Sequence, residues 1–484
     1  MKICLVTAFP PSGRQLNEYA FHIAQELQSN PMVDLTILGD ELSDYRFATD
    51  RDGKPVSANG ELPGFNVIRC WKFNHLGTPV RLLNTIRRLQ PDVVWFNLVF
   101  STFAAQDHPI TAFAGLCTPA LTRMIGCYTH VTLHHIIEHV DFSSFGVRQE
   151  RLFRLGSNLA TRTLLKANSV TVLLSGYHRT LMEKYSAENV VLGTHGIFAH
   201  CPTPPDFSKR GNPDQRIMAI GHWGTYKRLE TLMDAFPRVA LRVPNARLVI
   251  GGANHHTTPG YWESIREAHK SNSRINFLGY VPQDAIPELF ATASVLVMPY
   301  DSATGSSGPA HQACEYGVPI VSADIPDFKV MATDEEMAIS FYKTGDAADL
   351  ADKLVELLLS PERQRTMAEQ NFSAAVRMTM PSVVRNYMRW FELAKRKRAM
   401  GPFLAPSFRR WRRLHSRLAS RHPFLDWSQA PERAANDGIA TDGRSNGQGR
   451  SGFSDHGISW QPQPDEADFQ TPADPDAARQ RRHG

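Results

Sequence analysis

The sequence has no apolar run of about 18 residues, the length that a membrane-spanning helix needs. Its six cysteines are scattered and include no C-x-x-C pair. This usage favours a reducing compartment and speaks against a cysteine-based metal site. The apolar start, residues 1–8, stops at Pro10-Pro11 and is too short for the apolar region of a signal peptide. We therefore expect a cytoplasmic protein, which can also be peripheral on the inner face of the cell membrane.

Strong charge of one sign is confined to a single short segment. The 484 residues carry a formal net charge of +5. Residues 395–421 contain ten Lys and Arg residues and no Asp or Glu, whereas residues 1–394 are close to neutral. A neutral body speaks against nucleic-acid binding over the main surface, so we expect no nucleic-acid partner.

What the sequence does contain is a repeated alternation of strand-like and helix-like stretches. Short runs rich in Val, Ile and Leu are apolar on both faces, which is typical of buried parallel strands joined by crossover helices. The strands are predicted at residues 2–9, 33–39, 65–71, 92–98, 130–135, 169–175 and 190–196, and then at 216–222, 247–252, 275–280, 295–300, 319–324 and 339–342. The pattern predicts an α/β fold with two doubly wound, Rossmann-like domains that face each other across a cleft, where ligands bind at the carboxyl ends of the strands.

Changes in composition divide the chain into six segments. They are a first Rossmann-like domain (1–200), a proline-rich linker (201–214), a second domain (215–380), an amphipathic terminal helix (381–398), a basic amphipathic segment (399–424) and a disordered tail rich in Gly, Pro, Asp, Gln and Ser (425–484).

One candidate site follows the first strand of the second domain. The sequence Gly221-His-Trp-Gly-Thr-Tyr-Lys227 leads from that strand into a predicted helix. A glycine-relaxed loop and a cation beside a helix N-terminus suit an anionic phosphate. The alternative is an ordinary strand-to-helix turn with a surface lysine.

A second candidate site follows a later strand of the same domain. Thr304-Gly-Ser-Ser-Gly308 is a loop of small residues with accessible backbone N–H groups, and Pro309 suits the first position of a helix. Such a loop can cradle a sugar or a phosphate. The alternative is a plain loop between a strand and a helix.

Together the two motifs resemble the C-terminal domain of the group 1 glycosyltransferases, a large retaining family (family 4-like) with the GT-B fold. Three further stretches resemble family motifs in the family's order: Phe9-Pro-Pro-Ser-Gly13, Val131-Thr-Leu-His134 and Leu278-Gly-Tyr-Val-Pro282. The resemblance covers roughly residues 1–395. It implies that the first domain is the acceptor side, that the second binds the nucleotide-sugar, and that the terminal helix crosses back to the first domain.

The resemblance also assigns roles to individual residues. It implies two catalytic residues, Lys227 at the donor diphosphate and His134 facing the transferred sugar. The donor-binding residues that it implies are Gly13, His222, Thr304, Ser307, Gly308 and Gln312. Three of these depart from the family pattern, because His222 replaces an arginine and Thr304 and Gln312 replace two glutamates.

The activity implied by the resemblance is transfer of a sugar, expected to be a hexose, from a nucleotide-sugar to an acceptor hydroxyl with retention of configuration. The nucleotide-sugar is a co-substrate, and neither a metal nor another cofactor is expected, because Lys227 and helix N-termini offset the charge of the leaving diphosphate.

His135-Ile-Ile-Glu138-His139 matches an inverted zinc-protease motif. It directly follows a strand signal, however, so we interpret it as a loop and not as a metal site. Two other functions remain as alternatives to glycosyl transfer: a non-catalytic GT-B protein that binds a sugar nucleotide or a glycan, and a two-domain sugar-phosphate epimerase or isomerase.

The basic segment predicts where the enzyme acts. Phe408, Trp411, Leu414 and Leu418 share one helical face, with arginines around the other. This composition is typical of a helix in an anionic membrane interface, the alternatives being RNA contact or an unstructured basic tail. A membrane anchor in residues 395–421 predicts a lipid-linked saccharide acceptor, as in polysaccharide or glycoconjugate assembly.

Overall fold

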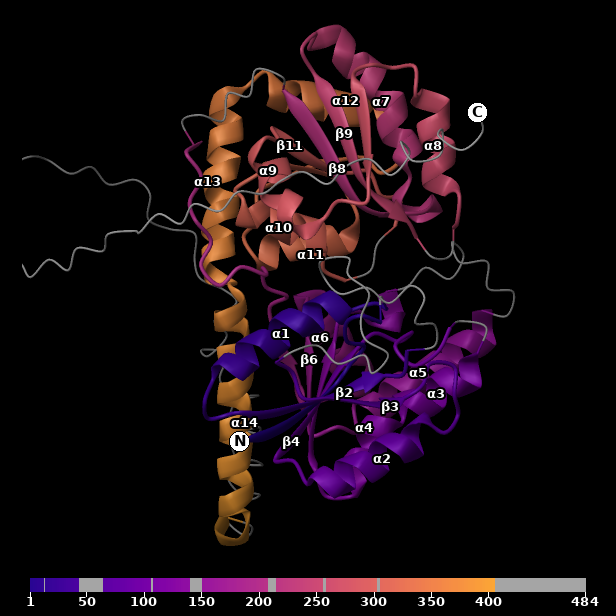
Figure 1. Ribbon diagram of the computed structural model, residues 1–484, viewed down its shortest axis with the longest axis vertical. Coiled ribbons are helices and arrows are strands. Elements are labelled where there is room, and N and C mark those ends of the chain that lie inside the picture. Colours follow the sequence, from indigo (N-terminus) through magenta and orange to yellow (C-terminus); the bar gives the residue numbers. More distant parts are fainter. Residues whose placement is uncertain are drawn as a thin grey trace, which may run out of the picture. The chain divides into compact units, whose positions relative to one another are not determined.

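The computed structural model describes most of the chain up to residue 404 (Figure 1). The described residues are 1–12, 14–42, 64–105, 108–139, 150–207, 215–255, 258–302 and 305–404. The chain forms two compact units, Met1–Ala405 and Pro406–Gly484, and the second lies outside the described residues. The candidate residues Gly13 and Thr304 lie outside them too, as does the basic segment from residue 405 onward.

The first sheet has seven parallel strands in the order β3-β2-β1-β4-β5-β6-β7. Both of its faces are covered by apolar side chains. Ile3 and Leu5 of β1 belong to one buried cluster, and Cys4 and Val6, which point to the opposite face, belong to another. The strands are β1 (Lys2–Val6), β2 (Asp34–Asp40), β3 (Val67–Trp71), β4 (Val93–Leu98), β5 (Tyr128–Leu133), β6 (Ser169–Val172) and β7 (Val190–Leu192).

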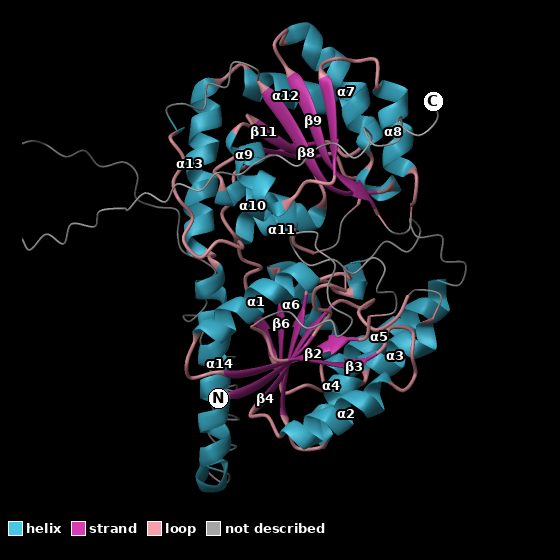
Figure 2. Ribbon diagram, in the orientation of Figure 1, coloured by secondary structure: helices cyan, strands magenta, loops and turns pink. Residues whose placement is uncertain are grey.

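Helices join these strands and supply the apolar cover (Figure 2). Helix α2 shows how the sequence specifies them: Pro79 lies in its first turn, and Leu82 and Ile86, four residues apart, are fully buried. The other helices are α1 (Asn17–Ser29), α3 (Pro109–Leu116), α4 (Thr118–Met124), α5 (Glu150–Leu164) and α6 (Ser175–Tyr185), with α2 at Thr78–Leu89 and a short 3₁₀ turn, η2, at Ile137–His139.

The second sheet has six parallel strands in the order β10-β9-β8-β11-β12-β13. The strand order reverses between β8 and β11, and in the first sheet between β1 and β4. In sheets of this kind the reversal opens a crevice at the carboxyl ends of the strands. The strands are β8 (Arg216–Trp223), β9 (Arg247–Asn254), β10 (Ile275–Gly279), β11 (Val295–Met298), β12 (Ile320–Ala323) and β13 (Ile339–Tyr342).

Helices also cover the second sheet, and one of them contains a proline. Helix α7 runs through Pro237 to Arg242. Phe236 and Val239 are fully buried, and this burial offsets the hydrogen bond that the proline removes. The elements are η4 (Thr225–Lys227), α7 (Leu229–Arg242), α8 (Tyr261–His269), η5 (Gln283–Ala285), α9 (Ile286–Ala291), α10 (Gly308–Glu315), α11 (Pro326–Asp334), α12 (Ala347–Leu358) and α13 (Pro361–Arg377).

The last helix, α14 (Met380–Leu404), packs against the first sheet. Tyr387 and Phe391 are buried in the apolar cluster that contains Ile3 and Leu5 of β1, and the ring of Tyr387 lies 4.4 Å from that of Trp95. The two sheets with their helices confirm the predicted α/β class. In the described part of the chain, no helix is both long enough and apolar enough to span a membrane.

Candidate active site

His134 directly follows β5, at the carboxyl end of the first sheet. Its Nε2 lies 2.7 Å from Asn97 Oδ1 on β4, and its ring meets the ring of Tyr19 edge to face at 4.7 Å. The imidazole is buried, which lowers the pKa of His134 well below its ordinary value, and the neighbouring His195 adds to the effect. His134 is therefore neutral, with Nε2 donating to Asn97 and Nδ1 left as an acceptor.

His195, just beyond β7, connects this group to the second sheet. Its ring lies 5.9 Å from that of His134 and 4.4 Å from that of His311, which is on α10. His311 Nε2 lies 2.9 Å from Glu335 Oε2, and both side chains are almost fully buried. Burial disfavours the charged forms, but the mutual attraction prevails: Glu335 raises the pKa of His311, and His311 lowers the pKa of Glu335. The pair is an ion pair beside two neutral histidines.

The loop before α10 contacts both halves of the fold. The backbone N–H of Gly305 donates to Tyr177 Oη at 2.6 Å and to Asp327 Oδ2 at 3.1 Å. Gly305 has φ +81°, and a Cβ built on it would lie 2.5 Å from the carbonyl oxygen of His134. Only glycine fits this position, because any side chain would push the loop away from His134.

The N-terminus of α10 carries three of the candidate donor-binding residues. The Ser307 hydroxyl caps the helix by accepting a hydrogen bond from the Ala310 N–H, so this side chain serves the fold. A Cβ built on Gly308 would have no described atom within 4 Å. Gln312, about one turn further, is half-buried, and its side-chain amide has no hydrogen-bond partner among the described residues.

Lys227 ends the 3₁₀ turn η4, close to the end of β8. Its Nζ lies 5.0 Å from the ring centre of Tyr300 and 5.9 Å from that of Tyr226, and a Cβ on Gly221 would lie 3.1 Å from it. Within the described ranges, Lys227 forms no ion pair. Burial lowers the pKa of Lys227 to about 8. A cation in these surroundings is stabilised by an anionic ligand. His222, in contrast, is exposed at the end of β8.

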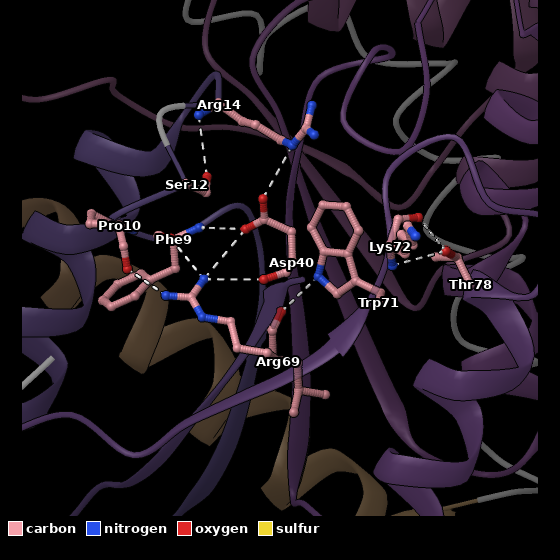
Figure 3. Close-up of polar contacts among 10 residues, drawn as sticks. Phe9, Pro10, Ser12, Arg14, Asp40, Arg69, Trp71, Lys72 and Thr78 are labelled. Carbon is pink, nitrogen blue, oxygen red and sulfur yellow. Dashed lines mark hydrogen bonds and ion pairs between the residues drawn. The ribbon is translucent and has the colours of Figure 1, made fainter. Parts of the chain in front are cut away.

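A buried polar cluster holds the loop after β1, as Figure 3 shows. Asp40, at the end of β2, accepts a hydrogen bond from the Phe9 N–H and lies 3.3 Å from Arg14 Nε. Arg69 donates to the carbonyl oxygens of Phe9 and Pro10 at 2.9 and 2.6 Å. The cluster therefore fixes the residues that lead to Gly13, which itself lies outside the described residues.

The inverted zinc-protease pattern does not lie on one α-helix. Residues 137–139 form the short turn η2, and His139 Nδ1 lies 3.0 Å from Asp327 Oδ1. Over the part of the chain that is described, no three His, Cys, Asp or Glu side chains form a group that could hold a metal ion.

A comparison with family models identifies the second half of this arrangement. Residues 214–360, from β8 through α12, match the model of the glycosyl transferases group 1. Residues 214–360 therefore form a group 1 glycosyltransferase domain. The match includes Lys227, Ser307, Gly308 and Gln312 of this glycosyltransferase, so the predicted family and the predicted class of enzyme are confirmed. No curated protein matches the sequence significantly.

Solved structures extend the likeness to both sheets. The glycosyltransferase is similar to sucrose-phosphate synthase from Thermosynechococcus elongatus, with a TM-score of 0.60, 15% identity, and 81% of this chain and 99% of that chain covered. It is similar to Anabaena HepE in complex with UDP, with a TM-score of 0.58 and 15% identity, and the match covers 81% of this chain and 100% of that chain. It is also similar to the lipopolysaccharide outer core galactosyltransferase WaaB, with a TM-score of 0.51 and 13% identity, and the match covers 82% of this chain and 100% of that chain. At such identities the likeness shows the fold, and it confirms the predicted GT-B architecture.

Several residues of the site were not identified from the sequence: Tyr19, Asn97, Tyr177, His195, His311, Asp327 and Glu335. The positions of some of these residues in the sequence could have indicated a place in the site. His195 lies near the end of a predicted strand and Asp327 just after another, where polar residues of parallel sheets gather. His311 adjoins Gln312. Nothing in the sequence, however, pairs His311 with Glu335.

Proposed function

We propose that this glycosyltransferase moves a sugar, a hexose in the simplest case, from a nucleotide-sugar donor to a hydroxyl of a lipid-linked saccharide, with retention of configuration. The observation that carries the donor part is Lys227, a cation held against two tyrosine rings without an ion-pair partner among the described residues. Its family domain and the complexes of the similar HepE with UDP and glucose support a nucleotide-sugar as the ligand that neutralises it.

In the proposed reaction, Lys227 and the N-terminus of α10 bind the diphosphate, and Gln312 hydrogen-bonds the ribose. Gly308 leaves room for the donor to approach the helix, and His222 and Thr304 complete the donor site. The bond between the sugar C1 and the phosphate oxygen breaks while a bond from C1 to the acceptor oxygen forms on the same face. The acceptor proton passes to the departing phosphate oxygen. Lys227 and the helix dipole supply the electrostatic stabilisation, so the proposal includes no metal or other cofactor.

His134 is the second proposed catalytic residue, on the acceptor side. As a neutral imidazole, it offers an acceptor nitrogen for a sugar hydroxyl at the carboxyl end of β5. Glycosyl transfer is favoured over epimerisation, isomerisation or binding alone because the family match lies on the donor-binding half of the fold.

The donor site can be tested by thermal unfolding with a panel of nucleoside diphosphates and nucleotide-sugars. A ligand that binds the folded state raises Tm, and the stabilisation grows with the logarithm of the ligand concentration once this exceeds Kd. We expect at least one nucleoside diphosphate to raise Tm, and Gln312→Leu to raise the donor KM about 3- to 30-fold, because one ribose hydrogen bond is lost. Gln370→Leu, on the exposed side of α13, is the control. An unchanged KM in Gln312→Leu would remove this residue from the ribose site.

The acceptor part of the proposal is supported by the outer face of α14. Trp390, Leu393 and Met400 share one face of the helix and are 46%, 41% and 51% exposed. Lys397 lies on the same face, and the four residues from 395 to 398 are all basic. Apolar side chains together with cations are the two signals that give stable binding to an anionic bilayer. A bilayer-bound enzyme is best served by an acceptor in the bilayer.

The membrane part is tested by co-sedimentation with anionic liposomes. The full chain is expected to sediment with them at low salt and less so at high salt, because salt screens the basic residues. Trp390→Glu and a chain that ends after Ala394 are expected to remain in the supernatant. Leu241→Glu changes an exposed leucine on α7 and serves as the matched control. If the shortened chain sediments as well as the full chain, the anchor is wrong and the acceptor is better sought among soluble saccharides.

A further inference from the structure

A buried carboxylate joins the loop before α10 to the acceptor-side half of the molecule. Asp327, in the first turn of α11, is buried and lies within hydrogen-bond distance of three groups. Tyr177 Oη donates to its Oδ2 at 2.5 Å, and the Gly305 N–H donates to the same oxygen at 3.1 Å. His139 Nδ1 lies 3.0 Å from its Oδ1.

The three partners come from different parts of the chain. Tyr177 is on α6 and His139 is in η2, both among the connections of the first sheet, whereas Gly305 belongs to the second half. Helix α6 is tied to α11 a second time, because the Ser175 N–H donates to Asp334 Oδ2 at 2.7 Å. Tyr177 is fully buried and its pKa is raised well above the ordinary value, so its hydroxyl stays protonated and donates.

The geometry leaves the loop little freedom. Residues 305–308, here called the donor loop, start at Gly305, which is held by Asp327 and Tyr177 and lies against the His134 carbonyl. The donor loop ends at Gly308, the first residue of α10, where an added Cβ would have no described atom within 4 Å. The direction of that helix N-terminus relative to His134 therefore depends on Asp327.

We propose that Asp327 is a positioning residue that sets the donor loop, and that Tyr177 and His139 make this setting depend on the acceptor-side half. The name of the donor loop and the expected kinetic result rest on the proposed function, whereas the contact between Asp327 and the loop does not. The donor loop is ordered for transfer only while α6 is docked on α11. Lys227, in η4, takes no part in this contact, so loss of the contact is expected to lower turnover more than it lowers nucleotide binding.

The test compares two tyrosines on the same helix. Tyr177→Phe removes the hydroxyl that bridges Asp327 and Gly305. Tyr185→Phe, the control, removes a hydroxyl that bonds Glu138 and Asn158, both on the acceptor side. Amide hydrogen exchange over residues 305–311 is measured in the full chain. We expect about 10-fold faster exchange in Tyr177→Phe and in His139→Gln, because each loses a hydrogen bond to a charged group, and no change in Tyr185→Phe.

A kinetic arm separates positioning from general damage. With UDP as the binding probe and a panel of UDP-sugars for turnover, Tyr177→Phe is expected to lower kcat about 10-fold, while the Kd of UDP stays within about threefold. The proposal is overturned if the donor loop of Tyr177→Phe exchanges like that of the parent, or if UDP affinity falls as much as kcat. If the parent binds no nucleoside diphosphate, the proposed function fails, and the exchange experiment still decides the role of Asp327.

Discussion

Lys227→Ala is expected to lower turnover by about 100- to 1,000-fold and to weaken nucleoside diphosphate binding, while the fold stays intact. The loss is this large because a preorganised cation that meets the leaving group's charge acts where water is excluded. The side chain forms no ion pair with any described residue, so its removal leaves no orphaned acid and costs little stability. Calorimetric titration with UDP and steady-state kinetics measure the two effects, and unchanged values for both would remove Lys227 from the donor site.

The low pKa of Lys227 adds a pH dependence to this prediction. Burial lowers its pKa to about 8, so the ammonium form that attracts a diphosphate is lost as the pH rises above that value. UDP affinity should therefore fall as the pH rises through about 8. Lys227→Arg is the control, because a guanidinium stays charged throughout this range. If the parent and Lys227→Arg show the same pH profile, another group is responsible.

His311→Gln is expected to destabilise the protein by about 3–5 kcal/mol, the usual effect of breaking a buried ion pair. The variant leaves the Glu335 carboxylate buried without its counter-charge. Replacing both partners by apolar residues of similar size, His311→Leu with Glu335→Met, should restore most of the loss. Urea unfolding monitored by fluorescence measures each difference. A double variant as unstable as His311→Gln would show that packing, not charge, is what the pair contributes.

The same pair predicts how this difference changes with pH. The folded-state pKa of His311 is raised, so its contribution is complete below the unfolded value of about 6.5 and is lost as the pH rises through the folded pKa. The pKa of Glu335 is lowered, so its contribution is complete above about 4.3 and is lost as the pH falls through the folded pKa. The difference in the free energy of unfolding between the parent and His311→Gln should be largest between about pH 4.3 and 6.5. A gap independent of pH would contradict the ion pair.

The local pattern of the sequence determined the fold class and the start of α10. The run at 92–98 is apolar on both faces and becomes β4, whose six residues are all buried. Pro309 was expected at the start of a helix and lies in the first turn of α10. These features follow from short-range effects, namely strand burial on two faces and the fixed φ of proline, and they are visible within a few residues.

Only the tertiary structure decided which charged and polar groups meet. Tyr177 and Asp327 are 150 residues apart in the chain, and His139 and Asp327 are 188 apart. No periodicity encodes such a pairing, because it depends on the order of strands in each sheet and on how α6 meets α11. The lowered pKa of Lys227 likewise arises from the side chains that bury it, among them the rings of Tyr226 and Tyr300. The sequence determines which residues can carry charge, and the packing of distant elements determines the charge that they carry.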